Sequence, residues 1–135
     1  RFGLYDAVMI KDNHIKGAGG IRAAVSAARA RIPHTMTIEV ETETIGQVEE
    51  ALEAGADIIM LDNMPPARMA EAVRLIRERA PHVKIEASGG VRLDTIREIA
   101  ATGVDIISVG ALTYSFESLD ISLDLGGKKA GGGQA

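Results

Sequence analysis

The side chains of this chain that could do chemistry follow short apolar runs. The segment DAVMIKDNHI, residues 6–15, passes from an apolar run at 7–10 to a cation, a carboxylate, an amide and an imidazole, which are Lys11, Asp12, Asn13 and His14. Several kinds of polar group at one end of a buried strand are typical of a ligand-binding site, provided that other strands bring polar groups to the same place.

Four later predicted strands also end in polar or glycine residues. Runs rich in β-branched residues predict strands at 8–11, 37–41, 57–62, 84–88 and 105–110. Alternate side chains of a strand point to opposite faces, so residue parity sorts them into two sets. One set is entirely apolar: Val8, Ile10, Ile38, Val40, Ile59, Leu61, Ile85, Ala87, Ile107 and Val109. The other set ends, strand by strand, in Lys11, Glu41, Asp62, Ser88 and Gly110, with Glu39, Glu86 and Ser108 one step deeper.

Helical patterns lie between these strands, each with a start or stop signal. The signals are an apolar stripe over 20–32, a capping box of Thr44 and Gln47 with a stop at Gly55, Pro66 in a first turn, and Asp94 as the cap of a helix toward Gly103. Strict alternation of strands and helices predicts a parallel sheet with helical crossovers.

The fold class that follows is α/β: a parallel (β/α) barrel of the TIM type, incomplete, with about five strand–helix units. The segments GADII and GVDII, which begin at Gly55 and Gly103, repeat two units apart, as in a barrel built from repeated units. A doubly wound sheet is the competing architecture, but its strands are usually apolar on both faces. Five units do not close an eight-stranded barrel. Either the barrel is small and incomplete, or more strands precede Arg1. We expect residues 1–125 to be a barrel domain and 126–135 to be a flexible Gly-rich tail.

Composition excludes several other classes of protein. The 135 residues are 46% hydrophobic and 25% charged, as in an ordinary globular domain. A formal net charge of −4 with scattered basic residues gives no nucleic-acid footprint. No apolar run approaches the roughly 20 residues of a membrane helix, and the absence of Cys excludes disulfides and thiolate metal sites. A cytoplasmic protein that binds neither nucleic acid nor membranes is expected.

The carboxylates at the predicted strand ends need positively charged groups near them. Glu41 and Asp62 come from neighbouring strands, and a buried carboxylate is costly unless a cation or a metal compensates its charge. One interpretation is structural, with Lys11 and Lys84 neutralising the acids as ion pairs. The functional interpretation is a site for Mg²⁺, for sugar hydroxyls or for a developing positive charge.

Two glycine-bearing loops follow the last two strands. The segments ASGG, residues 87–90, and SVGAL, residues 108–112, would let backbone N–H groups approach a phosphate closely. A lone Gly-Gly is usually a turn, so the pair of loops is what indicates a phosphate site. Residues expected outside the site are His14, a loop histidine of the kind that is more often structural, His34 and His82 at the opposite end, and Arg74, Arg77 and Arg79 on a solvated helix face.

Together these segments carry a family resemblance. The segments RFGLYDAVMIKDNHI, IEVE, DIIMLDNM, EASGG and VDIISVGALTYS occur in that order and are followed by LDISLDL. From Arg1 to about Leu125 the chain resembles the C-terminal part of the quinolinate phosphoribosyltransferases, also called carboxylating nicotinate-nucleotide pyrophosphorylases. The resemblance implies an enzyme of NAD biosynthesis that uses Mg²⁺. Such an enzyme converts quinolinate and phosphoribosyl pyrophosphate to nicotinate mononucleotide, pyrophosphate and CO₂.

The resemblance also implies roles for individual residues. Arg1 and Lys11 would bind the quinolinate carboxylates, and Lys11 would also reach the pyrophosphate. Glu41 and Asp62 would hold the ribose hydroxyls and Mg²⁺, and would offset positive charge as the pyrophosphate leaves; with Lys11 they would be the catalytic residues. The phosphate would lie against Ser88, Gly89, Gly90 and Gly110.

Two features depart from the family's pattern. Tyr114 stands where many relatives have a His in a phosphate-contacting loop, and a Tyr hydroxyl donates a hydrogen bond without a positive charge. The family also has an N-terminal domain and further basic residues ahead of the position of Arg1, and a partner subunit completes its active sites. A homodimer or higher homo-oligomer is therefore expected, and the chain by itself is expected to bind poorly or not to turn over.

Three alternatives stay open on the sequence. The chain could be a related barrel phosphoribosyltransferase with another substrate. It could be a catalytically incomplete half-barrel that self-associates through open sheet edges. It could also be an isomerase-like or aldolase-like phosphate-binding barrel in which Lys11 forms a Schiff base.

Overall fold

The computed structural model describes residues 7–109 and, for the backbone alone, 112–115. The strands of this part form one sheet in sequential order: β1 (Ala7–Ile10), β2 (Thr37–Thr42), β3 (Ile58–Asp62), β4 (Lys84–Ser88), β5 (Ile106–Val109) and β6 (Leu112–Ser115). Strands β1 to β5 pair in parallel, and β6 pairs with β5 in the antiparallel sense. The predicted strands β1 to β5 are confirmed with shifts of one residue at their ends, whereas β6 was not predicted.

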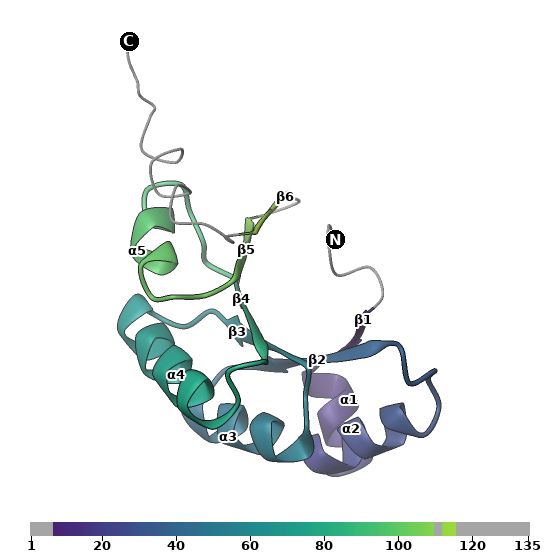
Figure 1. Cartoon of the computed structure of the whole chain (residues 1–135). Coiled ribbons are helices and arrows are strands. Elements are labelled where there is room, and N and C mark those ends of the chain that lie inside the picture. The colour runs from purple at the N-terminus through teal and green to yellow at the C-terminus, as the bar shows by residue number, and fades with distance from the viewer. Residues whose placement is uncertain (1–6, 110–111, 116–135) are drawn as a thin grey trace.

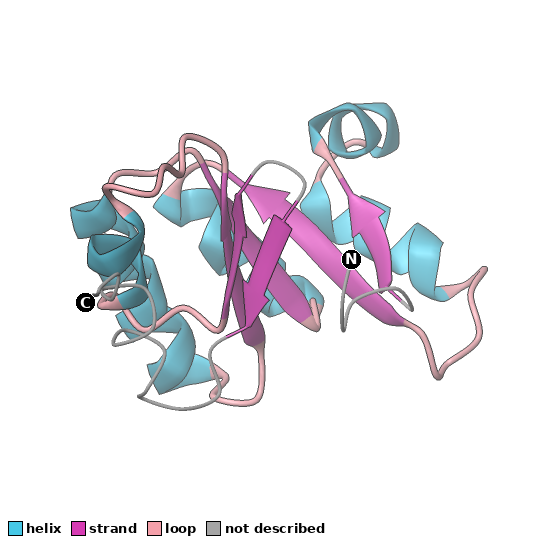
Figure 2. Ribbon diagram, turned by 90° about the horizontal axis from the view of Figure 1, so that it is seen from above, coloured by secondary structure: helices cyan, strands magenta, loops and turns pink. Residues whose placement is uncertain are grey.

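The helices between the strands are α1 (Asp12–Ala18), α2 (Ile21–Arg29), α3 (Ile45–Ala54), α4 (Pro66–Arg79) and α5 (Ile96–Ala100). The sheet is curved, and helices α2 to α5 lie along its convex side (Figure 1). Helix α1 lies beyond the carboxyl end of β1 (Figure 2). In the described part, α4 is the longest helix with 14 residues, and no helix combines the length and apolarity that a membrane crossing needs.

The helix signals of the sequence are partly correct. Thr44 accepts a hydrogen bond from the N–H of Gln47 at 3.1 Å at the start of α3, and Pro66 begins α4. The cap predicted for α5 is wrong, because α5 follows Thr95 and the Asp94 carboxylate pairs instead with Arg92 at 3.0 Å. Helix α1 was missed because its seven residues bury no apolar side chain and therefore show no periodicity.

The order of the strands distinguishes between the two predicted architectures. A doubly wound sheet has helices on both faces and reverses its strand order at a switch point. Here the five parallel strands follow one another in chain order and the helices that cover the sheet share one side, so the doubly wound alternative is excluded. The described residues form an α/β fold with five parallel strands, consistent with a partial barrel.

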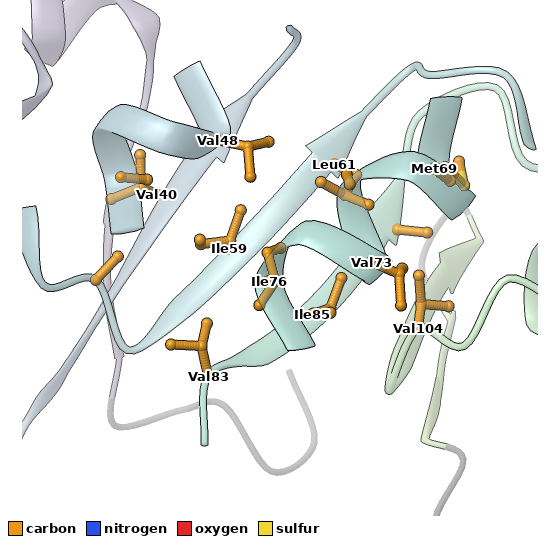
Figure 3. Close-up of a cluster of buried hydrophobic side chains, with 14 of the residues drawn as sticks. Val40, Val48, Ile59, Leu61, Met69, Val73, Ile76, Val83, Ile85 and Val104 are labelled. Atoms are coloured by element: carbon orange, nitrogen blue, oxygen red, sulfur yellow. The ribbon is translucent and has the colours of Figure 1, made fainter. Parts of the chain in front are cut away.

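The core lies between the sheet and these helices, as the parity of the strand residues predicted. All members of the apolar set are buried except Val8 and Val109, which are half-buried. Figure 3 shows Ile59, Leu61 and Ile85 of the strands beside side chains of α3 and α4. Burial of one such aliphatic side chain contributes about 1.5–3 kcal/mol, so this layer fixes which face of each strand meets the helices.

The sequence repeat has a structural counterpart at the amino ends of the strands. In the first copy, the Asp57 carboxylate accepts a hydrogen bond from Arg29 of α2 and another from a backbone N–H of β2, each at 2.8 Å. In the second copy, Asp105 accepts from Arg77 of α4 at 2.9 Å and from a backbone N–H of β4 at 2.8 Å. Arg77 was expected on a solvated helix face; it is instead half-buried because it pairs with Asp105.

Asp105→Ala is expected to lower the free energy of unfolding by about 1–3 kcal/mol, because it removes the acceptor of a partly buried N–H and the partner of Arg77. Urea denaturation measures the change. Glu53→Ala is the control, since Glu53 forms exposed ion pairs with Arg22 and Arg79 and its loss should cost about 0.5 kcal/mol or less. Equal losses in the two variants would contradict this account of the repeat.

Candidate functional site

The second parity set lies on the face of the sheet that the helices leave free, and its members are staggered rather than level. The parallel register places Asp62 beside Ser88, whereas Glu41 lies beside Met60. Strand β2 is therefore offset from β3 by one same-face position, as happens in a tilted, curved sheet, whereas β3 and β4 end at the same level. The predicted polar residues Lys11, Glu41, Asp62 and Ser88 therefore form a slanting row, called the polar band below. Glu41 lies one same-face position closer to the amino ends of the strands than Asp62 does.

The three predicted catalytic residues approach one another at the carboxyl ends of β1, β2 and β3. Lys11 is the exposed N-cap residue of α1, and its charge favours the ionised form of Glu41. The Glu41 carboxylate accepts a hydrogen bond from the backbone N–H of Asp12, and it also feels the charge of Asp62. The short helix α1 thus brings a cation and a backbone donor to the acid of β2.

The pKa of Glu41 is raised above its ordinary value. Burial is the largest cause, and the negative charges of Asp62 and Glu43 add to it. The charge of Lys11 and the N–H of Asp12 act in the opposite direction but do not cancel these effects. Burial and two neighbouring negative charges thus disfavour the ionised form of Glu41, and a cationic group close to Glu41 and Asp62 would favour it.

Glu41→Gln is expected to raise the free energy of unfolding at pH 7. The folded chain holds the pKa of Glu41 above the reference value of 4.5, so the wild type loses stability as the pH rises through the folded pKa. The advantage of the variant should therefore disappear below about pH 4.5, where Glu41 is protonated in both folded and unfolded chains.

Urea denaturation at pH 4 and at pH 7 measures this dependence. Glu49→Gln, on the exposed side of α3, is the matched control and should show no such change with pH. A Glu41→Gln variant that is less stable than the wild type at pH 7 would contradict the assigned cause of the raised pKa.

The predicted phosphate loop lies against the end of β3. The N–H of Asn63 donates to the carbonyl oxygen of Ser88 at 2.8 Å. A Cβ atom on Gly89 would lie 2.7 Å from Oδ1 of Asp62, and one on Gly90 would lie 2.7 Å from Oδ1 of Asn63. Both glycines also have positive φ angles, 78° and 69°. Glycine is favoured at both positions because of these φ angles and because the side chains of Asp62 and Asn63, at and just after the end of β3, occupy the space that a side chain in the loop after β4 would need. The sequence did not indicate this second reason.

The deeper acids of the band are enclosed. Glu39 and Glu86 are almost completely buried, at 0% and 1% exposure. The hydroxyl of Ser108 donates a hydrogen bond to Oε2 of Glu86, which joins two members of the predicted set across β4 and β5. The hydroxyl of Thr42, also buried, donates to the carbonyl oxygen of Met60 at 2.7 Å and ties β2 to β3 at the level of Glu41.

Other predicted residues lie apart from this band or outside the described residues. Arg1, Gly110 and the tail 126–135 fall outside them, and Tyr114 lies on β6, its backbone opposite Ile107. His34 and His82 are exposed, as expected. His14 is part of α1 rather than of a loop, and its Nδ1 accepts the N–H of Lys11 at 3.1 Å, which is a structural role.

A second concave feature lies on the helix side of β1. It is a groove of about 430 Å³ lined mainly by apolar residues of β1, α1 and α2, among them Val8, Ile10, Ala24 and Ala28. Glu41, Asp62 and the glycine loop do not line it. The groove offers little for a charged ligand, so the polar band is the candidate site.

The donors of the band fit a magnesium ion. Mg²⁺ is usually held by one or two protein carboxylates, with waters and substrate phosphates completing its coordination. Glu41 and Asp62 provide two such carboxylates, whose mutual repulsion a cation would relieve. Among the residues that the structure describes, no group of three or more His, Cys, Asp or Glu side chains has the arrangement of an all-protein metal site.

Asn63 is a residue of the site that the sequence did not reveal. It follows Asp62 directly and has a φ angle of +56°, which is unusual for a residue other than glycine. The only hint in the sequence is that the residue is an Asn, because Asn adopts left-handed backbone conformations more readily than most residues.

The fold and the site define an α/β domain that carries a charged site at the carboxyl edge of a parallel sheet, where ligands of this class of protein bind. The chain belongs to the quinolinate phosphoribosyl transferase C-terminal domain family, whose sequence profile matches residues 1–124. The resemblance inferred from the sequence is thus confirmed.

Individual relatives agree with the family match. The chain is 50% identical over 126 residues to "probable nicotinate-nucleotide pyrophosphorylase (carboxylating)" of Bacillus subtilis, covering 93% of this chain and 42% of the relative. It is 40% identical over 129 residues to the human nicotinate-nucleotide pyrophosphorylase (carboxylating), covering 96% of this chain and 43% of the relative. The nicotinate-nucleotide pyrophosphorylase structure from Francisella tularensis matches with a TM-score of 0.72 and 43% identity, over 82% of this chain and 38% of that chain. The chain therefore spans less than half the length of these proteins.

Proposed function

We propose that the chain is the C-terminal part of a quinolinate phosphoribosyltransferase that makes nicotinate mononucleotide, pyrophosphate and CO₂. The observation that supports this most is the convergence of Lys11, Glu41 and Asp62 at the carboxyl edge of the sheet, in a chain of this family. Residues 1–125 would belong to a TIM-type barrel whose remaining strands come from the part of the relatives that this chain does not match, and 126–135 would be a tail.

The chemistry requires a charged edge of this kind. As the bond between the anomeric carbon and the pyrophosphate oxygen breaks, the sugar becomes cationic, and the carboxylates of Glu41 and Asp62 stabilise it electrostatically. The ring nitrogen of quinolinate then bonds to the anomeric carbon. The resulting pyridinium stabilises the electron pair of the neighbouring carbon–carboxylate bond as CO₂ leaves. A proton from solvent then bonds to the carbon that lost CO₂. No covalent nucleophile on the protein is needed.

The roles of the binding residues are those that the family resemblance implies, and the placement of Lys11, Glu41 and Asp62 is consistent with them. Lys11, exposed at the start of α1, would bind a quinolinate carboxylate together with Arg1 and would reach the pyrophosphate. Glu41 and Asp62 would hold the ribose hydroxyls and Mg²⁺, and the ion, when bound, neutralises charge on the pyrophosphate. Successive N–H groups at the left-handed Gly89 and Gly90 favour an anion, so the phosphate would lie there. Ser88 and Gly110 would complete this phosphate site.

The assembly and location of the protein are part of the proposal. A second subunit would complete the active site, so the functional form would be a homodimer or a higher homo-oligomer in the cytoplasm.

The direct test is release of labelled CO₂ from carboxyl-labelled quinolinate in the presence of phosphoribosyl pyrophosphate and Mg²⁺. Release should require all three components and should fall by about 10²–10³-fold in Lys11→Ala, because a charged group at the reacting substrate is lost. His34→Ala is the control, since His34 is exposed and remote from the polar band.

The assay is run on the chain alone and on the chain preceded by the unmatched N-terminal part of the Bacillus subtilis relative. Release by the extended protein alone would support the proposal and place part of the site outside this chain. Absence of release from both proteins, with the folded state verified, would overturn it.

A further inference from the structure

Helix α1 brings two groups of the chain to the polar band. Lys11 is its N-cap residue, and the backbone N–H of Asp12 donates to the Glu41 carboxylate. The strand register gives the same placement. Ile10 pairs with Val40, so the next residues, Lys11 and Glu41, leave neighbouring strands at one level. The interactions that hold the first turn of α1 thus decide how close the Lys11 cation stays to the acid of β2.

The helix itself has few stabilising contacts. Its seven residues include none that is fully buried, although Ile15 is half-buried against the core. An isolated helix of fewer than about 12 residues is marginal in water. The ion pair of Asp12 with Lys16, at 3.1 Å, is exposed and adds little. The order of the first turn therefore depends on the hydrogen bonds at its start.

We propose that His14 is a positioning residue that orders the first turn of α1 and so holds Lys11 beside Glu41. The inference rests on the proposed function for the reaction that Lys11 serves, but not for the order of the helix. His14 itself is not placed on the substrate; it acts through Lys11.

The His14 imidazole supplies an acceptor that the first turn otherwise lacks. The N–H of an N-cap residue has no partner inside its helix, and a side chain at the third helical position often accepts its hydrogen. Here Nδ1 of His14, at that position, accepts the N–H of Lys11 at 3.1 Å. Glu or Gln is the usual residue in this role. An imidazole fills it only with the proton on Nε2, so that Nδ1 keeps a free lone pair.

The backbone of Lys11 is held on two sides by this turn. Its N–H donates to His14, and its carbonyl oxygen accepts the N–H of Ile15 at 3.0 Å. Without the imidazole acceptor, the N–H of Lys11 would turn to water and the first turn would open more often. The Lys11 side chain and the N–H of Asp12 would then spend less time beside Glu41, so both site contacts of α1 would weaken together.

The first experiment reads the order of α1 without any substrate. Hydrogen exchange of the Ile15 N–H, followed by NMR in the ligand-free chain, reports opening of the first turn. His14→Ala should speed this exchange about fivefold, the usual effect of losing a cap, even though Ala itself favours helix. His14→Gln, which keeps an acceptor at the same position, should stay within about twofold of the wild type. The N–H of Val48, which makes the equivalent bond at the start of α3, is the internal control and should not change.

The second experiment tests whether His14 acts through Lys11. The extended protein is assayed for CO₂ release at limiting quinolinate, which gives kcat/KM. His14→Ala should lower kcat/KM about tenfold, and His14→Gln should restore most of it. In a Lys11→Ala background the same substitution should cost less than about twofold, because the cation that His14 positions is already absent. His34→Ala, at an exposed histidine of a remote loop, is the matched control and should leave kcat/KM unchanged.

Three results would each overturn the positioning role. They are unchanged exchange of Ile15 in His14→Ala, no recovery in His14→Gln, and an equal loss of kcat/KM with and without Lys11, which is the result expected if His14 contacts the substrate directly. If the wild-type extended protein releases no CO₂, the proposed function fails. The exchange of Ile15, which needs no ligand, then still decides whether His14 orders the first turn of α1.

Discussion

The structure depends on one constraint, which is that neighbouring side chains of a parallel strand must point to opposite faces. The helices on the convex side take the apolar set, and residues such as Ile59 and Ile85 become fully buried beneath them. The polar set is then forced onto the free face, where Glu41 and Asp62 arrive from separate strands. Slipping one strand by a single residue would exchange the two faces and bury its acids under a helix.

The same constraint explains which features of the fold and the site could be predicted from the sequence. Strand positions, the buried face and the residues of the polar band were predictable, because a period of two is visible in a single chain. The stagger that sets Glu41 beside Met60 was not, since register depends on how strands tilt against one another. Helix α1, the pairing of Arg77 with Asp105 and the left-handed turn at Asn63 depend on contacts between distant segments, which no local pattern reports.

Residues of the candidate site also lower the stability of the folded chain. Glu41 and Asp62 are partly buried and repel one another, and the charge of Lys11 and the N–H of Asp12 do not cancel the combined effect of burial and the neighbouring negative charges on Glu41. Asn63 holds a backbone conformation that is costly for most residues. The carboxylates of Asp57 and Asp105 lie at the opposite, amino ends of the strands, where they bind Arg29 of α2 and Arg77 of α4 and so link these helices to the sheet. Along β3, the stabilising contacts of Asp57 and the strained turn at Asn63 thus lie at opposite ends.

The central claim is that a phosphoribosyl ligand binds at the carboxyl edge of the sheet. Backbone amide shifts in the NMR spectrum of the extended protein, titrated with phosphoribosyl pyrophosphate and Mg²⁺, test it most directly. The account predicts the largest shifts at Lys11, Glu41, Asp62 and Gly89, with little change at Ala28 in the groove beside α2. Shifts confined to that groove, with none at Glu41, would contradict it.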